Sequence, residues 1–460
     1  MGVASEDGEV GNGGVLMAGI FKAYDVRGVY PDELDEDMMR RIGNAYLQFI
    51  GGAGKSIVVG RDGRLHSASL KDALVEGLLD GGARVIDIGL CTTPMNYFAI
   101  GHLNVDGGLM VTASHNPPQY NGLKVSRAQA FPCSYEGGLC EIEKIVEVGE
   151  YVKAAGGQVE REEVLDAYAE HVGKVAGDLS GIRIAVDCGN GIAGPFFQQV
   201  FEPTGLTIVG LYMEPDGRFP NHEPNPLKEE NLRDVGEAVR EHGCDVGLAF
   251  DGDGDRCRFV TEEGATVGAD ITTAFVAMRK LRRHRGAKIV YDVRSSRVVE
   301  EEVRKAGGVP VLCRVGHAYM KETMRKEDAL FGGELAGHFY FRENFYADSG
   351  FLIAATVLRI IKEEEKPFSE LLRPLLRYYA TGEVNFEVAD KDAKIAQIAE
   401  HFRKEGADID FIDGVTVRFD DWWANIRKSN TEPLLRLNLE ANSAELRDRM
   451  RAEIERLIRS

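Results

Sequence analysis

The same order of predicted elements occurs three times along this chain of 460 residues. Each time an apolar strand ends in a charged residue, a helix follows, and a second apolar strand comes after a glycine or a turn. The first strands are predicted at 57–62, 182–187 and 288–292, the helices at 69–79, 192–201 and 296–305, and the second strands at 85–88, 206–211 and 309–315. This alternation is typical of βαβ units with parallel strands. The repeat therefore predicts three similar α/β domains.

A third apolar strand follows in each unit, and each of the three leads into a different polar cluster. The clusters have the sequences TASHNP at 112–117, DGDGDR at 251–256 and GGELAGH at 332–338. Enzymes of the α/β class bind their ligands beyond the carboxyl ends of parallel strands. An ordinary polar turn is the alternative for each segment taken alone. Because the clusters stand at equivalent positions of three repeats, we expect one cleft to which each domain contributes one loop.

The remaining sequence has a different pattern and predicts a small α+β domain. A strand is predicted at 384–388, a helix at 390–404, a hairpin at 409–419 around Asp413-Gly414, a strand at 434–439 and a helix at 443–458. The predicted fold is thus α/β, with three similar mixed-sheet domains and a smaller C-terminal α+β domain around a central cleft. We place the domains at 15–168, 169–266, 267–377 and 378–460, after a disordered extension at 1–14.

Composition excludes several classes of partner. The formal net charge is −19, whereas proteins that bind nucleic acids concentrate basic surface. The apolar runs are too short to span a bilayer, and the Gly-rich, acidic start differs from a signal peptide. The seven cysteines have no zinc-like spacing, which favours reduced thiols in the cytoplasm. We expect small-molecule ligands, with no nucleic acid, membrane or obligate protein partner evident.

The second cluster has the pattern of a metal site. Asp251, Asp253 and Asp255 alternate with glycines, which permit the backbone dihedrals that let three carboxylates converge. Without a cation, three anions so close would repel one another, although a solvated acidic loop is the alternative. An EF-hand is not supported, since Arg256 stands where that loop needs glycine. Three carboxylates leave room for a phosphate oxygen and water, which suits Mg²⁺ in phosphoryl transfer.

A polar segment in the C-terminal domain suits a phosphate that is bound but not cleaved. Arg427, Ser429, Asn430 and Thr431 combine a guanidinium, two hydroxyls, an amide and backbone N–H groups. A solvated turn is the alternative for this segment.

Three further side chains could take part in sugar binding and proton transfer. Glu334 could accept hydrogen bonds from sugar hydroxyls, and His338 could exchange protons near neutral pH. Lys124 could accept a proton if burial lowers its pKa. For each residue taken singly, a structural or surface role is the alternative.

Taken together, the motifs resemble the α-D-phosphohexomutase superfamily, and most of all its phosphomannomutase/phosphoglucomutase group. The resemblance covers residues 20–460 and rests on motifs in all four predicted domains. It implies that Ser114 carries a phosphoryl group and that a phosphoserine oxygen joins Asp251, Asp253 and Asp255 around Mg²⁺. It implies a catalytic set of Ser114, Lys124, His338, Arg27 and His115. The implied substrate-binding set is Tyr24, Asn116, Arg256, Arg294, His317, Glu334, Arg427, Ser429, Asn430 and Thr431.

The implied activity is the interconversion of hexose 1-phosphate and hexose 6-phosphate, with mannose or glucose as the sugar. It would run through a bound hexose 1,6-bisphosphate, which also serves as activator. Two positions bear on the sugar: Ala336 replaces the usual serine of the third loop, and Gly254 stands where phosphoglucosamine mutases typically carry alanine. The alternatives are a phosphoglucosamine mutase, a sugar-phosphate phosphatase that uses the same serine and metal, and a non-catalytic sugar-phosphate sensor.

Overall fold

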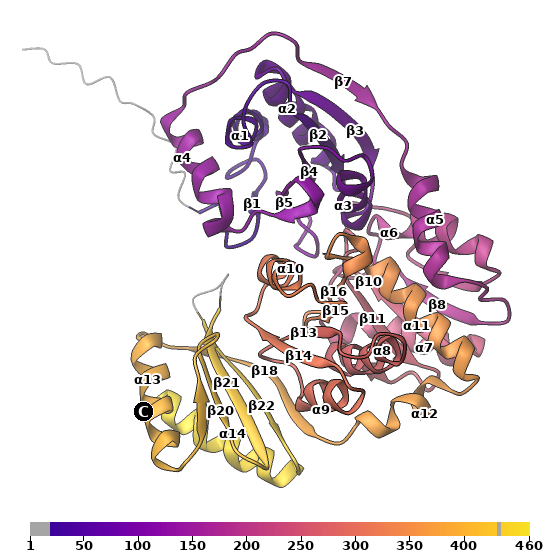
Figure 1. Cartoon of the computed structure of the whole chain (residues 1–460), viewed down its shortest axis with the longest axis vertical. Helices are drawn as coiled ribbons and strands as arrows, with labels where there is room; N and C mark the ends of the chain where they lie inside the picture. Colours follow the sequence, from indigo (N-terminus) through magenta and orange to yellow (C-terminus); the bar gives the residue numbers. More distant parts are fainter. Residues whose placement is uncertain (1–18, 430–433) are drawn as a thin grey trace, which may run out of the picture.

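The computed structural model describes residues 19–429 and 434–460, so the expected extension at 1–14 lies outside the described residues. Figure 1 shows four units in chain order, from the indigo N-terminal unit to the yellow C-terminal one. Within the described residues, the first unit contains a seven-stranded sheet and each of the others a five-stranded sheet. The predicted fold class is confirmed: three mixed-sheet α/β domains precede a smaller C-terminal domain.

The first three sheets share one strand order, which explains the repeat in the sequence. The central strands are β2 (Ser56–Arg61), β8 (Arg183–Asp187) and β13 (Lys288–Asp292). On one side each pairs in parallel with β3 (Arg84–Leu90), β9 (Thr207–Leu211) or β14 (Val309–Cys313). On the other side each pairs in parallel with β4 (Gly107–Val111), β10 (Val246–Phe250) or β15 (Phe331–Gly333).

The three polar clusters occupy equivalent turns in these sheets. Each follows β4, β10 or β15 and leads into an antiparallel neighbour, which is β5 (Tyr120–Arg127), β11 (Cys257–Thr261) or β16 (Phe339–Phe341). The sheets are completed by β1 (Val26–Val29), β6 (Phe131–Pro132), β7 (Gln158–Arg161), β12 (Thr266–Val267) and β17 (Ala347–Asp348). All three clusters therefore stand at carboxyl ends of parallel strands, where α/β folds bind ligands.

Helices cover the three sheets. They are α1 (Glu36–Phe49), α2 (Ser67–Asp80), α3 (Thr93–His102), α4 (Cys140–Val148), α5 (Leu165–Ala176), α6 (Ala193–Phe201), α7 (Arg233–His242), α8 (Ala269–Arg283), α9 (Arg297–Lys305), α10 (His317–Lys326), α11 (Gly350–Glu364) and α12 (Phe368–Leu372). No helix within the described residues is both long and apolar enough to cross a bilayer. The seven cysteines are free thiols, and six of them are buried.

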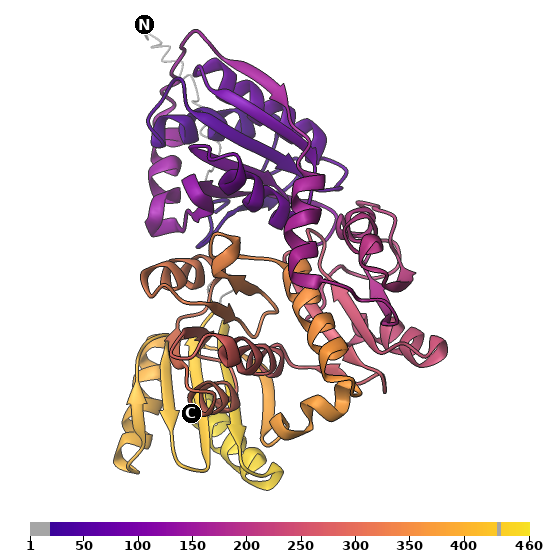
Figure 2. The same cartoon turned by 45° about the vertical axis from the view of Figure 1, so that its right-hand side comes forward.

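Helix α11 of the third domain packs against α5 and β11 as well as α8, and it starts directly behind the acidic loop. Its N-cap is Ser349, whose Oγ accepts a hydrogen bond from the backbone N–H of Leu352 at 3.1 Å. Figure 2 shows α11 lying alongside α5, and these helices are in contact. Phe351 packs at 5.4 Å between ring centroids against Phe250, the last residue of β10. A buried Phe contributes about 1.5–3 kcal/mol, so this packing helps to fix the loop that follows β10.

The C-terminal domain is an antiparallel sheet with two helices. The strand order is β18 (Tyr379–Glu387), β22 (Leu434–Ala441), β21 (Trp422–Lys428), β20 (Val415–Arg418) and β19 (Asp408–Asp410). The helices are α13 (Lys391–Lys404) and α14 (Ala444–Arg459). The sequence pattern did not predict β21, because residues 422–427 are all buried and lack the alternation of a half-exposed strand. Arg427 therefore lies in a strand and not in a turn.

Candidate active site

Ser114 stands on a tightly held turn after β4. Its φ of 50° lies in the left-handed region, which is strained for a residue other than glycine by about 1–3 kcal/mol. Its backbone N–H donates to the Thr112 hydroxyl at 2.9 Å. Its Oγ donates to Oδ2 of Asp251 at 2.8 Å and lies 3.2 Å from Nδ1 of His115. The turn thus aims the serine hydroxyl at the acidic loop of the second domain.

Arg64 holds this turn in place, and it was not among the residues predicted for the site. Its guanidinium donates to four backbone carbonyls of the loop, those of Ser114, Asn116, Pro117 and Tyr120, at 2.7–3.1 Å. The side chain is almost fully buried and also pairs with Asp62. The signal in the sequence is Asp62-Gly63-Arg64 at the end of the first predicted strand, but only the fold shows that Arg64 reaches the loop.

The three aspartates of the second cluster converge, as the spacing predicted. Asp251, Asp253 and Asp255 are buried, and their ligand oxygens lie within 4.8 Å of one another. Burial and the neighbouring Asp255 and Asp253 raise the pKa of Asp251 well above its usual value. Oδ1 of Asp253 and Oδ1 of Asp255 are buried and have no hydrogen-bond partner in the described part of the chain. Unpartnered carboxylate oxygens in one cluster are the donors that a hard divalent cation prefers, so the residues present fit such an ion.

Lys124 on β5 is a buried ammonium in contact with the same cluster. Its Nζ donates to Asp253 at 2.6 Å and also to Asp255. Burial alone would lower the pKa of Lys124, but the carboxylates of Asp253 and Asp255 outweigh it and hold the pKa well above the usual value. The condition on which Lys124 was expected to accept a proton, a pKa lowered by burial, is therefore not met in this arrangement. Its contacts with the two carboxylates favour the ammonium form of Lys124.

The same contacts act on Asp255. Burial would raise the pKa of Asp255, but Lys124 and then His338 outweigh it and lower the pKa to about 2. Asp255 is therefore ionised, as a metal-ligating carboxylate must be.

The loops of the second and third domains are joined by Arg256 and His338. The two residues form an isolated β-bridge, and Nε of Arg256 donates to Nε2 of His338 at 2.9 Å. The guanidinium also lies 3.6 Å from Oδ2 of Asp251. Since Asp251 accepts from Ser114, the structure brings the loops of all three repeats together, as the sequence pattern predicted.

Two more predicted residues lie against the Ser114 turn. Arg27 of β1 donates to Oδ1 of Asn116 at 2.5 Å and pairs with Asp25. Burial, together with Arg256 and Arg27, lowers the pKa of His115 well below its usual value, so its ring is neutral at pH 7. The guanidiniums of Arg27 and Arg64 therefore hold the turn, while the hydroxyl of Ser114 itself contacts Asp251 and the neutral ring of His115.

A second group of predicted residues lies on the third domain. Glu334 accepts from the backbone N–H of Gly316 at 2.9 Å and from the hydroxyl of Tyr340. The ring of Tyr24 packs edge-on against His317 at 5.4 Å, and its hydroxyl donates to the carbonyl of Val315 at 3.0 Å. These contacts bring Tyr24, from the first domain, beside the loop that precedes α10.

Three arginines of the third and fourth domains converge on Glu383 of β18. Arg427 pairs with Glu383 at 2.7 Å, Arg436 at 3.1 Å and Arg294 at 4.0 Å. Arg294 also makes a two-pronged contact with Asp292, at 2.7 and 3.2 Å. Convergent guanidiniums suit an anion with several oxygens, such as a phosphate.

Of the other predicted residues of the C-terminal loop, the structure describes one. Ser429 follows β21, where its backbone N–H donates to the carbonyl of Leu434 at 2.9 Å. Asn430 and Thr431 lie outside the described residues.

Comparison with known proteins follows the same division into four parts. The domain models of the phosphoglucomutase/phosphomannomutase family match in order: α/β/α domains I, II and III match residues 18–152, 166–264 and 269–379, and the C-terminal domain matches 383–457. The chain belongs to the phosphoglucomutase/phosphomannomutase family. The enzyme is therefore a phosphohexomutase, of the isomerase class.

Individual members of this family match almost the whole chain. The phosphomannomutase of Salmonella typhimurium (strain LT2) is 41% identical over 92% of this chain and 94% of its own. A protein of Xanthomonas campestris pv. campestris (strain B100) named "Phosphohexose mutases" is 40% identical over 95% and 99%. The crystal structure of a phosphoglucomutase/phosphomannomutase family protein from Burkholderia thailandensis is similar with a TM-score of 0.87, at 34% identity over 95% and 96%.

Proposed function

We propose that this phosphohexomutase interconverts the 1-phosphate and 6-phosphate of a hexose, mannose or glucose, through a phosphorylated Ser114 and a hexose 1,6-bisphosphate. The observation that carries the proposal is the contact of Ser114 Oγ with Asp251 inside a buried cluster of three carboxylates. A serine phosphate formed there would have an oxygen beside Asp251, Asp253 and Asp255. These residues would then hold Mg²⁺, which supplies positive charge to the transferring phosphoryl group when it is bound.

In the proposed reaction, the bond between phosphorus and Ser114 Oγ breaks as the free hydroxyl of a hexose monophosphate bonds to phosphorus. The sugar hydroxyl loses a proton, and Ser114 Oγ regains one. The bisphosphate then rotates within the cleft, so that its other phosphoryl group faces Ser114 and is transferred to it. We assign the proton exchanges to Lys124: its ammonium gives a proton to Ser114 Oγ, and the amine that remains takes the proton of the sugar hydroxyl. His338 acts through Arg256, whose Nε donates to its Nε2. A hexose 1,6-bisphosphate in solution would phosphorylate Ser114 initially and so act as activator.

For the bisphosphate to rotate within the cleft, a second set of residues, called the phosphate grip below, must bind the phosphate that does not react. Arg427 and Arg436 on neighbouring strands of the fourth domain and Arg294 of the third domain provide such a grip. Guanidiniums bind a phosphate through its oxygens whichever carbon of the sugar carries it. The grip therefore accepts both orientations of the substrate, and in each orientation Glu334 would accept hydrogen bonds from the sugar hydroxyls that face it.

Substitution of Arg427 by alanine should mainly weaken substrate binding. Loss of a hydrogen bond to a charged group amounts to about 1.5–3 kcal/mol, so we expect KM to rise by roughly tenfold to a hundredfold. The value of kcat should change less, because Arg427 does not touch the reacting serine. Steady-state kinetics with mannose 1-phosphate checks this, with Arg403→Ala on the exposed face of α13 as the matched control. A KM equal to that of the control would remove Arg427 from the phosphate grip.

Substitution of Ala336 by serine should strengthen binding of the sugar. Ala336 lies between Glu334 and Gly337 on the third loop and is partly exposed, so a hydroxyl fits there without entering the core. A neutral hydrogen bond contributes about 0.5–1.5 kcal/mol, which corresponds to a decrease in KM of about twofold to tenfold. Parallel kinetics on the glucose and mannose substrates measures the effect on selectivity. Unchanged constants for both sugars would show that position 336 does not contact the sugar.

The identity of the sugar is tested by comparing glucose, mannose and glucosamine 1-phosphates at equal concentration. Gly254 has a φ of +75°, and an added Cβ would lie 3.3 Å from Thr92, which suits glycine better than the alanine typical of phosphoglucosamine mutases. We therefore expect kcat/KM for glucosamine 1-phosphate to be the lowest of the three. The proposal of mannose or glucose as substrate fails if glucosamine 1-phosphate is preferred.

A further inference from the structure

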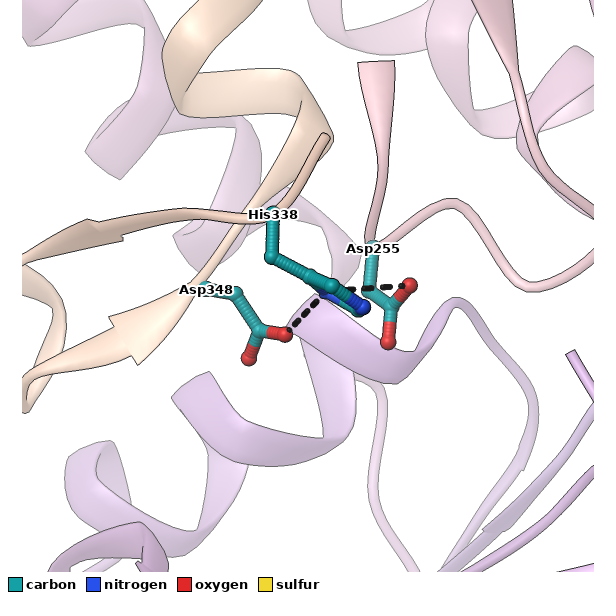
Figure 3. Close-up of side chains that lie close together, drawn as sticks. All are labelled: Asp255, His338 and Asp348. Atoms are coloured by element: carbon teal, nitrogen blue, oxygen red, sulfur yellow. Dashed lines mark ion pairs between the residues drawn. The ribbon is translucent and has the colours of Figure 1, made fainter. Parts of the chain in front are cut away.

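Two buried charged residues that the sequence pattern did not predict lie behind His338. Asp348 ends β17, and Lys321 lies on α10; their side chains are 0% and 1% exposed. Figure 3 shows the carboxylate of Asp348 on one side of the imidazole of His338 and Asp255 on the other. Nδ1 of His338 lies 2.7 Å from Oδ2 of Asp348 and 3.6 Å from Oδ1 of Asp255. Asp348 is therefore the nearer partner of this ring nitrogen.

Both ring nitrogens of His338 face groups that determine which of them carries the proton. Nε2 accepts a hydrogen bond from Nε of Arg256, and a guanidinium N–H is always a donor, so Nε2 must be without a proton. The proton of the neutral ring then stands on Nδ1, which faces the carboxylate of Asp348. The hydrogen bond at Nε2 requires this tautomer, and the carboxylate 2.7 Å from Nδ1 favours it.

Asp348 is fixed in position and charge by its surroundings. Strand β17 pairs with β16, so the backbone places Asp348 opposite Tyr340, two residues after His338. Nζ of Lys321 lies 2.7 Å from Oδ1 of Asp348 and packs over the ring of Tyr97 at 3.9 Å. Burial would raise the pKa of Asp348, but Lys321 and His338 outweigh it and hold the pKa well below its usual range. Asp348 therefore faces His338 as a carboxylate.

A second divalent cation is the competing interpretation, since the ligand atoms of Asp255, His338 and Asp348 lie within 4.8 Å of one another. The neighbouring charges oppose it. The ammonium of Lys321 already neutralises Asp348, and the guanidinium of Arg256 already occupies Nε2 of His338. A cation at this position would stand close to both, where repulsion is strong because the groups are buried. The arrangement suits the orientation of an imidazole better than the binding of a metal.

We propose that Asp348 is a positioning residue, which holds His338 as the Nδ1–H tautomer so that Nε2 accepts from Arg256 and orients its guanidinium toward Asp251 and Ser114. The importance of this orientation for turnover rests on the proposed function of His338 and Arg256 in phosphoryl transfer. The tautomer itself does not depend on that function. Partners that orient a functional group in this way typically change activity by about 10–100-fold when they are altered.

The direct test is nitrogen NMR of the full chain labelled with ¹⁵N-histidine, recorded at pH about 8.5, where an ordinary imidazole is neutral. The chain has ten histidines, and the spectrum of a His338→Gln variant identifies the signals of His338. We expect a proton on Nδ1 and a bare Nε2. A bare Nδ1, or protons on both nitrogens, overturns the proposal without any further variant.

The kinetic test uses Asp348→Asn. We expect kcat to fall about 10–100-fold and KM to stay within about twofold, while the Nδ1 signal of His338 shifts because its carboxylate partner is gone. The double variant Lys321→Met/Asp348→Asn gives the same expected result without an unpaired buried charge, in case the single variant does not fold. Asp87→Asn is the matched control, because it breaks the buried pair of Lys71 and Asp87, 2.6 Å apart in the first domain, and should leave kcat and the His338 signals unchanged.

Two results separate this proposal from the proposed function. A folded Asp348→Asn variant with wild-type kcat and an unchanged His338 signature overturns the positioning role even if the enzyme is a mutase. If the wild-type protein shows the Nδ1–H tautomer but converts no sugar phosphate, the proposed function fails and the orientation by Asp348 stands.

Discussion

The Ser114→Ala variant should lose at least about a thousandfold in kcat for the conversion of mannose 1-phosphate. Alanine has no oxygen that could carry the phosphoryl group, and among the described residues Ser114 supplies the hydroxyl that bonds to Oδ2 of Asp251. The fold should stay intact, because removal of one hydroxyl leaves the backbone contacts of the turn with Arg64 in place. Steady-state kinetics measures the loss, and circular dichroism checks the fold.

Ser126→Ala is the matched control, since Ser126 is a buried serine on β5 of the same domain and was not assigned to the site. It should keep wild-type kcat. Mass spectrometry provides a second readout, in which wild-type protein treated with glucose 1,6-bisphosphate gains one phosphoryl group on the peptide that contains Ser114. If Ser114→Ala turns over at the wild-type rate, Ser114 is not the phosphoryl carrier.

Removal of divalent cations should abolish catalysis. Substitution of a carboxylate that would hold the cation should also lower kcat strongly. Chelation with EDTA is expected to stop the reaction and Mg²⁺ to restore it. Asp253→Asn should lower kcat at least about a hundredfold, because positive charge at a transferring phosphoryl group contributes several kcal/mol. Among the residues that the structure describes, none forms a hydrogen bond with Oδ1 of Asp253, so the substitution acts on a position that suits a cation.

Thermal melting with and without Mg²⁺ adds a readout that does not depend on activity. A cation that binds the folded protein raises Tm, and this rise should shrink in Asp253→Asn. Asp245→Asn is the control, because Asp245 lies in the same domain before β10 and accepts from the backbone N–H of Arg183, away from the three carboxylates. Full activity of the wild-type enzyme in EDTA would contradict a role for the metal.

The local part of this structure could be predicted from the sequence. The strand–helix–strand order of the first three domains depends on short apolar runs and their spacing, and the observed strands β2, β8 and β13 agree with the predicted ones within a residue or two. The convergence of the three polar loops follows from their equivalent places in the repeat. Strand β21 could not be predicted, because it is buried on both faces and has no alternation.

The rest depends on contacts between distant parts of the chain. The pKa of Lys124 is raised and not lowered, because Asp253 and Asp255 of another domain pair with it. Asp348 is an unremarkable acidic residue in the sequence, and only the pairing of β16 with β17 brings it to His338. Arg64 likewise gains its role from the fold, which places its guanidinium under the Ser114 turn. The charges of these side chains and the directions in which they point therefore depend on tertiary contacts.

The central claim is the transfer of a phosphoryl group between sugar positions without its release to water. The most direct test is phosphorus NMR of the wild-type protein with Mg²⁺, a trace of glucose 1,6-bisphosphate, and mannose 1-phosphate or glucose 1-phosphate. The account predicts that the signal of the 1-phosphate is replaced by that of the 6-phosphate, with no inorganic phosphate. Accumulation of inorganic phosphate would indicate a phosphatase, and binding without conversion of either sugar would indicate a sensor; both results contradict the account.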